Sequence, residues 1–260
     1  IKLNDKRKLL EQNILDEIDF DKIQKENKNV IIYFNKNINE GLIGIIEGIP
    51  AGMNITEEYI EKDLLRRMQG HGRGGRMKIE KDHAEIFSGV RHAITLGSPI
   101  SLLIKNFDWV NWEDRMATGK PKKEHRKVTM PRPGHADLAG VMKYGLDDIR
   151  NVLERSSARE TAMRVAIGAV CRKLLEEVGI TVGSRVYQIH NIVDNTPVSN
   201  DMGLKELNDT VDASPVRCFD KAAEKKMMDV IDEARNIGDS VGGSFEVIAN
   251  GLPYGLGTYI

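Results

Sequence analysis

The chain has 260 residues, of which 40% are apolar, and its 38 Lys and Arg nearly balance 39 Asp and Glu, for a formal net charge of −1. This length predicts one large domain or two small ones, and the balanced charge excludes a whole-chain field that selects polyanions or membrane surfaces. No apolar run approaches the ~20 residues of a spanning helix, no signal peptide is recognisable, and Cys171 and Cys218 fit neither a disulfide framework nor a zinc motif. We therefore expect a soluble, cytoplasmic protein of a reducing compartment, and the initial Ile1 indicates a piece of something longer.

Residues 1–42 differ in composition from the rest of the chain. They are rich in Lys, Asn and Ile and contain a single glycine. Apolar residues near helical spacing predict an amphipathic helix over Lys6–Lys25, and the run Val30–Phe34 predicts a strand. Because nothing in this segment carries recognisable chemistry, we treat 1–42 as a separate segment and expect one domain over 43–260.

The first part of that domain is predicted to alternate strands and a helix. A strand is expected over Leu42–Glu47, and Thr56 is placed to cap a helix that Gly70 ends. That helix has one apolar face, made by Ile60, Leu64, Leu65 and Met68. Two more strands are expected over Met77–Phe87 and Ile100–Lys105.

The second part begins with an irregular stretch and then returns to regular elements. Residues 106–134 are Lys-rich and lack periodicity, and loops of that length are usually functional or disordered. Helices are predicted over Ala158–Val178 and Lys221–Ile237. Strands are predicted over Val182–Ile192 and Ser244–Ala249, which makes the whole chain α+β.

One internal echo points to two related halves. The run I-I-E-G-I-P-A-G-M that starts at Ile45 returns as I-A-N-G-L-P-Y-G-L from Ile248, with its Gly, Pro and Gly each displaced by 203 residues. A strand that leads twice into G-[IL]-P-x-G is a repeat signal, although strand-Gly-x-Pro turns also arise by chance. If the echo is real, the second half is incomplete in this chain.

Three basic clusters stand out, over Arg66–Lys78, Lys120–Arg132 and Arg150–Arg164. Arginine dominates the first and third, which favours bidentate recognition of carboxylate or phosphate, although any single cluster is more often a solvated surface. In the third, S-A-R-E from Ser157 is a capping box that starts the long helix at Ala158. Its free N–H groups, with Arg155, Ser156 and Ser157 just before them, predict a phosphate or anionic-cofactor site.

Two further motifs bear on function, one rich in glycine and one that contains His135. The run G-H-G-R-G-G from Gly70 formally matches a dinucleotide fingerprint, but that reading requires a preceding strand and a following helix, and here a helix is predicted to precede. It is better interpreted as an Arg-presenting loop, with an RNA-binding module as a remaining alternative. In R-P-G-H-A-D, His135 is placed to act as a general acid at neutral pH beside the anion site of Arg132, with Asp137 available to orient its ring.

Taken together, six segments resemble the chorismate synthase family in order and spacing. They are G-H-G-R-G-G-R-M from Gly70, S-G-V-R-H from Ser88, L-G-S-P-I from Leu96, R-P-G-H-A-D from Arg132, E-R-S-S-A-R-E-T from Glu154 and G-D-S-V-G-G from Gly238. The resemblance implies a β-α-β sandwich of two related halves, here with the second half truncated, and assembly as a homotetramer.

The resemblance also implies a reaction and its residues. Members convert 5-enolpyruvylshikimate 3-phosphate, a phosphorylated dicarboxylate, to chorismate by 1,4-elimination in aromatic amino acid biosynthesis, with reduced FMN as cofactor and NADP as an associated nucleotide. By this resemblance His135 lies near the flavin and keeps it in the monoanionic form. The substrate's anionic groups are held by Arg67, Arg73, Arg76, Arg132 and Arg159, and FMN is contacted by Arg155, Ser156 and Ser157, with Arg67 and Arg73 also near it. No metal, nucleic-acid partner or membrane is expected.

The chain also departs from the family pattern. Members carry G-E-S-H-G just before the strand expected at Leu42–Glu47, and this chain reads N-K-N-I-N-E-G from Asn35 instead. The histidine that protonates the leaving phosphate is therefore absent, and the C-terminal R-S-D segment with its catalytic Asp is not found before Ile260. We expect impaired activity, and a remnant that binds anions or FMN without turnover is the alternative.

Overall fold

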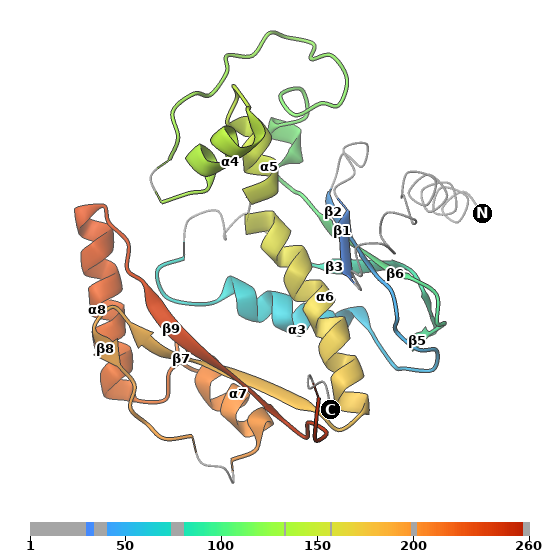
Figure 1. Cartoon of the computed structure of the whole chain (residues 1–260), viewed down its shortest axis with the longest axis vertical. Helices are drawn as coiled ribbons and strands as arrows, with labels where there is room; N and C mark the ends of the chain where they lie inside the picture. Colours follow the sequence, from blue (N-terminus) through green and yellow to red (C-terminus); the bar gives the residue numbers. More distant parts are fainter. Residues whose placement is uncertain are drawn as a thin grey trace. The chain divides into compact units, whose positions relative to one another are not determined.

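The computed structural model describes residues 30–33, 41–73, 81–132, 134–156, 158–198 and 202–256. It is a mixture of helices and strands, which confirms the α+β class (Figure 1). The chain divides into two compact units, of which the first holds Ile1–Leu64 and Ile79–Gly168 and the second Leu65–Lys78 and Ala169–Ile260, as far as these are described. The helix predicted over Lys6–Lys25 lies outside the described residues.

The first unit is built on an antiparallel sheet of order β1-β2-β6-β3. Its strands are β1 (Val30–Tyr33), β2 (Gly41–Ile46), β6 (Ile100–Lys105) and β3 (Ala84–Ser88). The strands predicted near residues 30, 42 and 100 are thus confirmed. Strand β6 lies inside the sheet, between β2 and β3, and five of its six residues are buried. The strand predicted over Met77–Phe87 starts later, at Ala84, since 81–83 lie outside any strand and 77–80 outside the described residues.

Helix α3 (Glu57–Met68) begins where its cap residue predicts. The Thr56 hydroxyl accepts a hydrogen bond from the Tyr59 amide at 3.2 Å, which satisfies a free N–H of the first turn. Ile60 and Leu64 are fully buried. Leu65, which is predicted on the same apolar face, is 46% exposed.

Helix α6 (Ala158–Glu177) starts at Ala158, as the capping box predicts. Its first half crosses close to β2, where a Cβ on Gly44 would lie 2.5 Å from the Met163 sulfur. A side chain at position 44 would therefore force the Met163 and Ile167 side chains of α6 to move. Two short helices were missed, α4 (Asp137–Tyr144) and α5 (Arg150–Ser156), and β4 (Val90–Arg91) and β5 (Ile94–Thr95) form an unpredicted hairpin.

The described part of 106–134 contains a single turn of 3₁₀ helix, Trp109–Asn111, and is otherwise irregular, as expected. Asp114 organises it by accepting hydrogen bonds from the Lys122 amide at 2.6 Å and from His125 Nε2 at 2.8 Å.

The second unit contains a three-stranded antiparallel sheet of order β8-β7-β9. The strand predicted over Val182–Ile192 is in fact two, β7 (Thr181–Ile189) and β8 (Ile192–Val193), because the chain turns at His190 with a φ of 53°. Helix α7 (Leu204–Asp212) was missed, and it packs Leu204 and Leu207 against Gly183 of β7.

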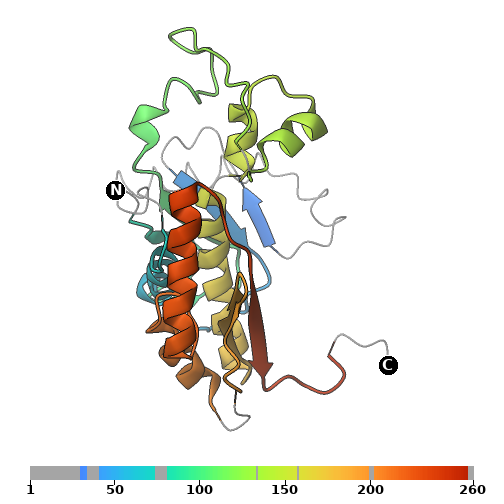
Figure 2. The same ribbon diagram turned by 90° about the vertical axis from the view of Figure 1, so that its left-hand side faces the viewer.

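Helix α8 (Lys221–Ile237) has the predicted bounds, with Asp220 as its cap and left-handed Gly238 at its end. Strand β9 (Gly243–Asn250) confirms the strand predicted over Ser244–Ala249 and forms one edge of the described sheet (Figure 2). Phe245 and Val247 on β9 are 73% and 61% exposed, so this edge offers both unpaired backbone groups and apolar side chains.

The backbone supports the internal echo. Gly48 after β2 and Gly251 after β9 have φ values of 82° and 81°, and the next pair, Gly52 and Gly255, have φ values of 95° and 79°. Such left-handed values are strained for other residues. The two turns therefore share glycine positions and backbone conformation.

Candidate functional site

The predicted site residues fall in both units, and each group is described within its own unit. Arg67 and Arg73 belong to the second unit, whereas Arg132, His135, Arg155, Ser156 and Arg159 belong to the first. Arg76, Ser157 and the Arg155 side chain lie outside the described residues.

The segment Gln69–Arg73, here called the arginine loop, follows directly on α3, so a helix precedes the glycine motif as expected. The Arg73 side chain turns back toward that helix, and its Nε donates to the Gln69 carbonyl at 3.0 Å. Arg73 is exposed, and no acceptor among the described residues is bonded to its two terminal nitrogens. This geometry leaves them available to an anion, while Arg67 is half-buried at the end of α3.

The arginine loop is attached to the rest of the second unit at three points. The His71 amide donates to the Pro215 carbonyl at 2.8 Å, and His71 Nε2 lies 2.9 Å from Asp232 Oδ1 on α8. A Cβ on Gly72, whose φ is +78°, would lie 2.8 Å from Ile231 of α8. Only glycine lets the chain run this close to the helix.

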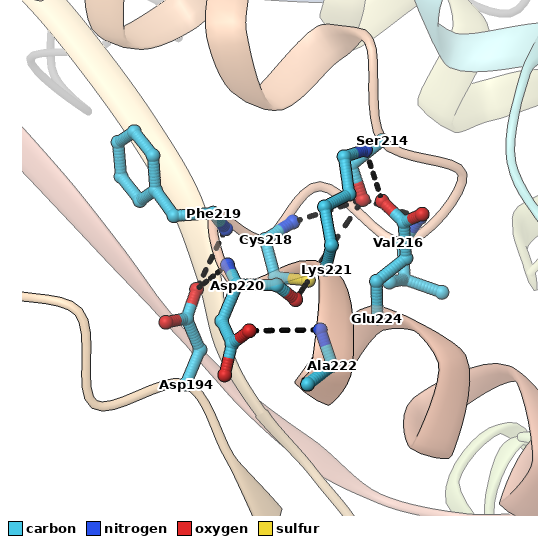
Figure 3. Close-up of polar contacts among 9 residues, drawn as sticks. All are labelled: Asp194, Ser214, Val216, Cys218, Phe219, Asp220, Lys221, Ala222 and Glu224. Atoms are coloured by element: carbon cyan, nitrogen blue, oxygen red, sulfur yellow. Dashed lines mark hydrogen bonds and ion pairs between the residues drawn. The ribbon is translucent and has the colours of Figure 1, made fainter.

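The turn that carries Pro215 is fixed by Ser214 (Figure 3). The Ser214 hydroxyl accepts hydrogen bonds from the Val216 and Cys218 amides, each at 3.3 Å. Cys218 is buried below the turn, and burial raises the pKa of its thiol. The thiol is therefore kept protonated and acts as a packing group.

Asp194 fixes the residues that follow this turn, Phe219 and Asp220 (Figure 3). Its carboxylate is fully buried and accepts from the amides of Thr196 at 3.0 Å, Phe219 at 2.6 Å and Asp220 at 3.3 Å. Burial alone would raise the pKa of Asp194, but the hydrogen bonds from Thr196, Phe219 and Asp220 outweigh it, so the pKa is lowered. Asp194 thus remains charged and anchors the start of α8.

Replacing Asp194 by Ala is expected to lower the free energy of unfolding by about 2 kcal/mol, because buried N–H groups lose a charged acceptor. Urea unfolding followed by circular dichroism measures this, with Asp209→Ala on exposed α7 surface as the matched control. Since the folded pKa lies below the unfolded one, the contribution is present above pH ~4 and is lost as the pH falls through the folded pKa. A loss below about 0.5 kcal/mol at pH 7 would contradict this role.

In the first unit Arg132 and Asp137 form a two-pronged ion pair. Arg132 Nε and Nη2 donate to the two carboxylate oxygens at 2.9 and 3.0 Å, and the Arg132 amide adds a third bond at 2.9 Å. The hydrogen bonds from the Arg132 side chain and then its amide lower the pKa of Asp137 to about 2. The interpretation that Asp137 orients the His135 ring is therefore wrong, because its carboxylate binds Arg132 instead. His135 itself is exposed, just before α4.

Arg159 is buried on the first turn of α6. It pairs with Asp82, and its Nη2 donates to the Lys105 carbonyl at 2.6 Å. The two side chains are 5% and 0% exposed. Its expected contact with substrate stays a prediction, because the structure shows this guanidinium in a buried ion pair.

The junction of α5 and α6 differs in part from expectation. Arg155 and Ser156 precede α6 as predicted, but they form the last turn of α5 and not a loop. The Ser156 hydroxyl donates to the Val152 carbonyl at 3.0 Å. Glu160, the acidic residue of the capping box, accepts from Arg164 Nε at 2.8 Å. An arginine and a serine still stand beside the N-terminus of a long helix.

Four acceptors that organise these regions were not singled out from the sequence: Asp82, Asp194, Ser214 and Asp232. Asp82, Asp194 and Asp232 bond to residues far along the chain, whereas Ser214 bonds to amides within four residues of it. Among the described residues no group of His, Cys, Asp and Glu is arranged to hold a metal ion. The described helices also include none with the length and apolar character needed to cross a membrane.

Comparison with known proteins gives a consistent result. A family model described as chorismate synthase matches residues 34–260. A chorismate synthase of Listeria welshimeri is 51% identical over 223 residues, which are 85% of this chain and 57% of that protein. One from Syntrophomonas wolfei is 54% identical over 222 residues, 85% of this chain and 56% of that protein. A solved structure described as a crystal structure of chorismate synthase matches with a TM-score of 0.66 and 40% sequence identity. The match covers 85% of this chain and 58% of the chain in that structure. The chain thus spans somewhat over half the length of these relatives.

Proposed function

The chain belongs to the chorismate synthase family, and from this premise we propose that it acts in the conversion of 5-enolpyruvylshikimate 3-phosphate to chorismate and phosphate, a lyase reaction that requires reduced FMN. The observation that carries the proposal is the family match over 34–260, which contains both R-P-G-H-A-D and R-S-S-A-R-E-T. The proposal extends to a cytoplasmic homotetramer with NADP as an associated nucleotide, as the resemblance implies.

The residues proposed to bind the substrate suit the chemistry of its anionic groups. The substrate carries two carboxylates and a phosphate, and arginine binds such planar or multi-oxygen anions with paired N–H groups. Arg73 supports this best, because it is exposed on the arginine loop and its terminal nitrogens bond to no acceptor among the described residues. The same role is proposed for Arg67, Arg76, Arg132 and Arg159.

FMN would be held at the α5–α6 junction. An arginine, Ser157 and the N-terminus of a 20-residue helix supply donors suited to a phosphate group, and Ser156, whose hydroxyl donates to the Val152 carbonyl, stands beside them. We assign Arg155, Ser156 and Ser157 to it, and His135 to holding a proton beside the flavin. When bound, FMN supplies the reduced flavin that the elimination requires and is not consumed.

The second candidate is a chain that binds these ligands without turnover. It is favoured by one observation, the absence of a histidine from Asn35–Gly41 where the family has G-E-S-H-G. Ligand binding is common to both candidates, and turnover separates them.

Titration calorimetry tests the ligands. We expect the chain to bind 5-enolpyruvylshikimate 3-phosphate and reduced FMN, and Arg155→Ala to weaken FMN binding at least tenfold, since a charge-assisted hydrogen bond contributes about 1.5–3 kcal/mol. Arg235→Ala, which removes an exposed charge from α8, is the control and should leave FMN affinity unchanged. Absence of binding of both ligands at millimolar concentration would contradict the proposed function, and equal FMN affinity in Arg155→Ala would contradict the site.

A further inference from the structure

The arginine loop contains little to hold its own shape. Two of its five residues, Gly70 and Gly72, are glycines with φ values of +117° and +78°. Glycine-rich backbone loses more conformational freedom on ordering than other backbone. A ligand that had to order this loop itself would bind more weakly. The position of Arg73 therefore depends on its own hydrogen bond to the Gln69 carbonyl and on contacts between the loop and the rest of the second unit.

Those contacts converge on His71. Its amide is bonded to Pro215 and its ring to Asp232, whereas Gly72 beside it packs on Ile231. The Pro215 end is rigid, because Ser214 fixes the turn and Asp194 fixes the chain just after it (Figure 3). The Asp232 end lies on α8, a helix with hydrogen-bonded caps at both ends.

We propose that Asp232 is a positioning residue: by holding the His71 ring it fixes the arginine loop in the conformation that presents Arg73 to an anionic ligand. The identity of that ligand rests on the proposed function. The ring of His71 is the only side chain of the described loop that bonds to α8, and its contact spans 161 residues of sequence. Without it the described loop keeps two backbone hydrogen bonds to the rest of the second unit, from the Gln69 amide to the Arg66 carbonyl and from the His71 amide to the Pro215 carbonyl.

The electrostatic effect of Asp232 and its proposed positioning effect predict opposite changes in anion affinity when Asp232 is neutralised. Asp232 is negative and lies near the loop, so its field alone disfavours an anion, and neutralising it would strengthen anion binding. If Asp232 acts by positioning, neutralising it weakens binding, because the ligand must then order the loop.

The experiment uses the 260-residue chain as wild type, Asp232→Ala and the control Asp229→Ala, which removes an exposed acid one turn away on α8. The first measurement is amide hydrogen exchange at residues 69–73. We expect the His71 amide to exchange at least fivefold faster in Asp232→Ala and at the wild-type rate in Asp229→Ala. His71→Ala removes the same contact from the other side and should reproduce the increase, with α8 amides unchanged as evidence of an intact fold.

The second measurement is titration with 5-enolpyruvylshikimate 3-phosphate. We expect about fivefold weaker binding in Asp232→Ala, equal or tighter binding in Asp229→Ala, and no further loss when Asp232→Ala is added to Arg73→Ala. Unchanged exchange at His71, or unchanged or tighter binding in Asp232→Ala, would overturn the inference. If the wild type binds no substrate, the proposed function fails, and hydrogen exchange alone then decides the role of Asp232.

Discussion

The 260-residue chain is expected to form chorismate at least 100-fold more slowly than the Listeria welshimeri relative. The resemblance assigns delivery of a proton to the leaving phosphate to the histidine of G-E-S-H-G, and this chain has N-I-N-E-G over Asn37–Gly41. A positioned acid or base typically contributes about 10²–10⁴-fold to a rate. The measurement is a stopped assay for chorismate under anaerobic conditions with reduced FMN, run beside the relative. Rates within about tenfold of each other would contradict the expectation.

A matched variant tests whether this position is the cause. Glu40→His places a histidine directly before Gly41, as in the family motif, and Glu40→Gln removes the same charge without adding a proton donor. We expect Glu40→His to raise the rate by tenfold or more and Glu40→Gln to leave it unchanged. An equal response to both changes would show that charge, and not a missing acid, limits the reaction.

Breaking the buried pair of Asp82 and Arg159 is expected to have the largest effect on stability. Asp82→Ala removes the carboxylate partner of a guanidinium that is 5% exposed, and removing one partner of a buried pair costs about 3–5 kcal/mol, because the remaining charge loses its counter-charge. Urea unfolding of the first unit measures the loss. Arg164→Met is the control, since its pair with Glu160 lies on the surface of the same helix and should contribute about 0.3–0.5 kcal/mol.

The double variant Asp82→Leu with Arg159→Met separates charge from packing. It removes both charges at once, so we expect it to be more stable than Asp82→Ala. If the double variant is less stable than the single one, the pair contributes through its geometry and not through the unpaired charge. A loss below about 1 kcal/mol in Asp82→Ala would show that the guanidinium finds water or another acceptor.

The sequence by itself determined the elements whose signals are local. The start of α6 follows from its capping box, and the bounds of α8 follow from a helical period. Strand β6 follows from a short buried apolar run. The family also follows from short motifs, because their residue types and spacing are specific without any knowledge of contacts. In contrast, α4, α5 and α7 were missed, since helices of seven to nine residues provide too few turns for a clear period.

Only the tertiary structure decided which charged groups pair. The sequence suggested that Asp137 orients its neighbour His135. The Asp137 carboxylate instead binds Arg132, whose planar guanidinium donates a hydrogen bond to each of its two oxygens. Arg159 pairs with Asp82, which is 77 residues away in the sequence, and His71 pairs with Asp232, which is 161 residues away. Such pairs form where folding removes both groups from water or brings two elements together. The free energy that selects them depends on burial and geometry, which no local pattern of residues contains.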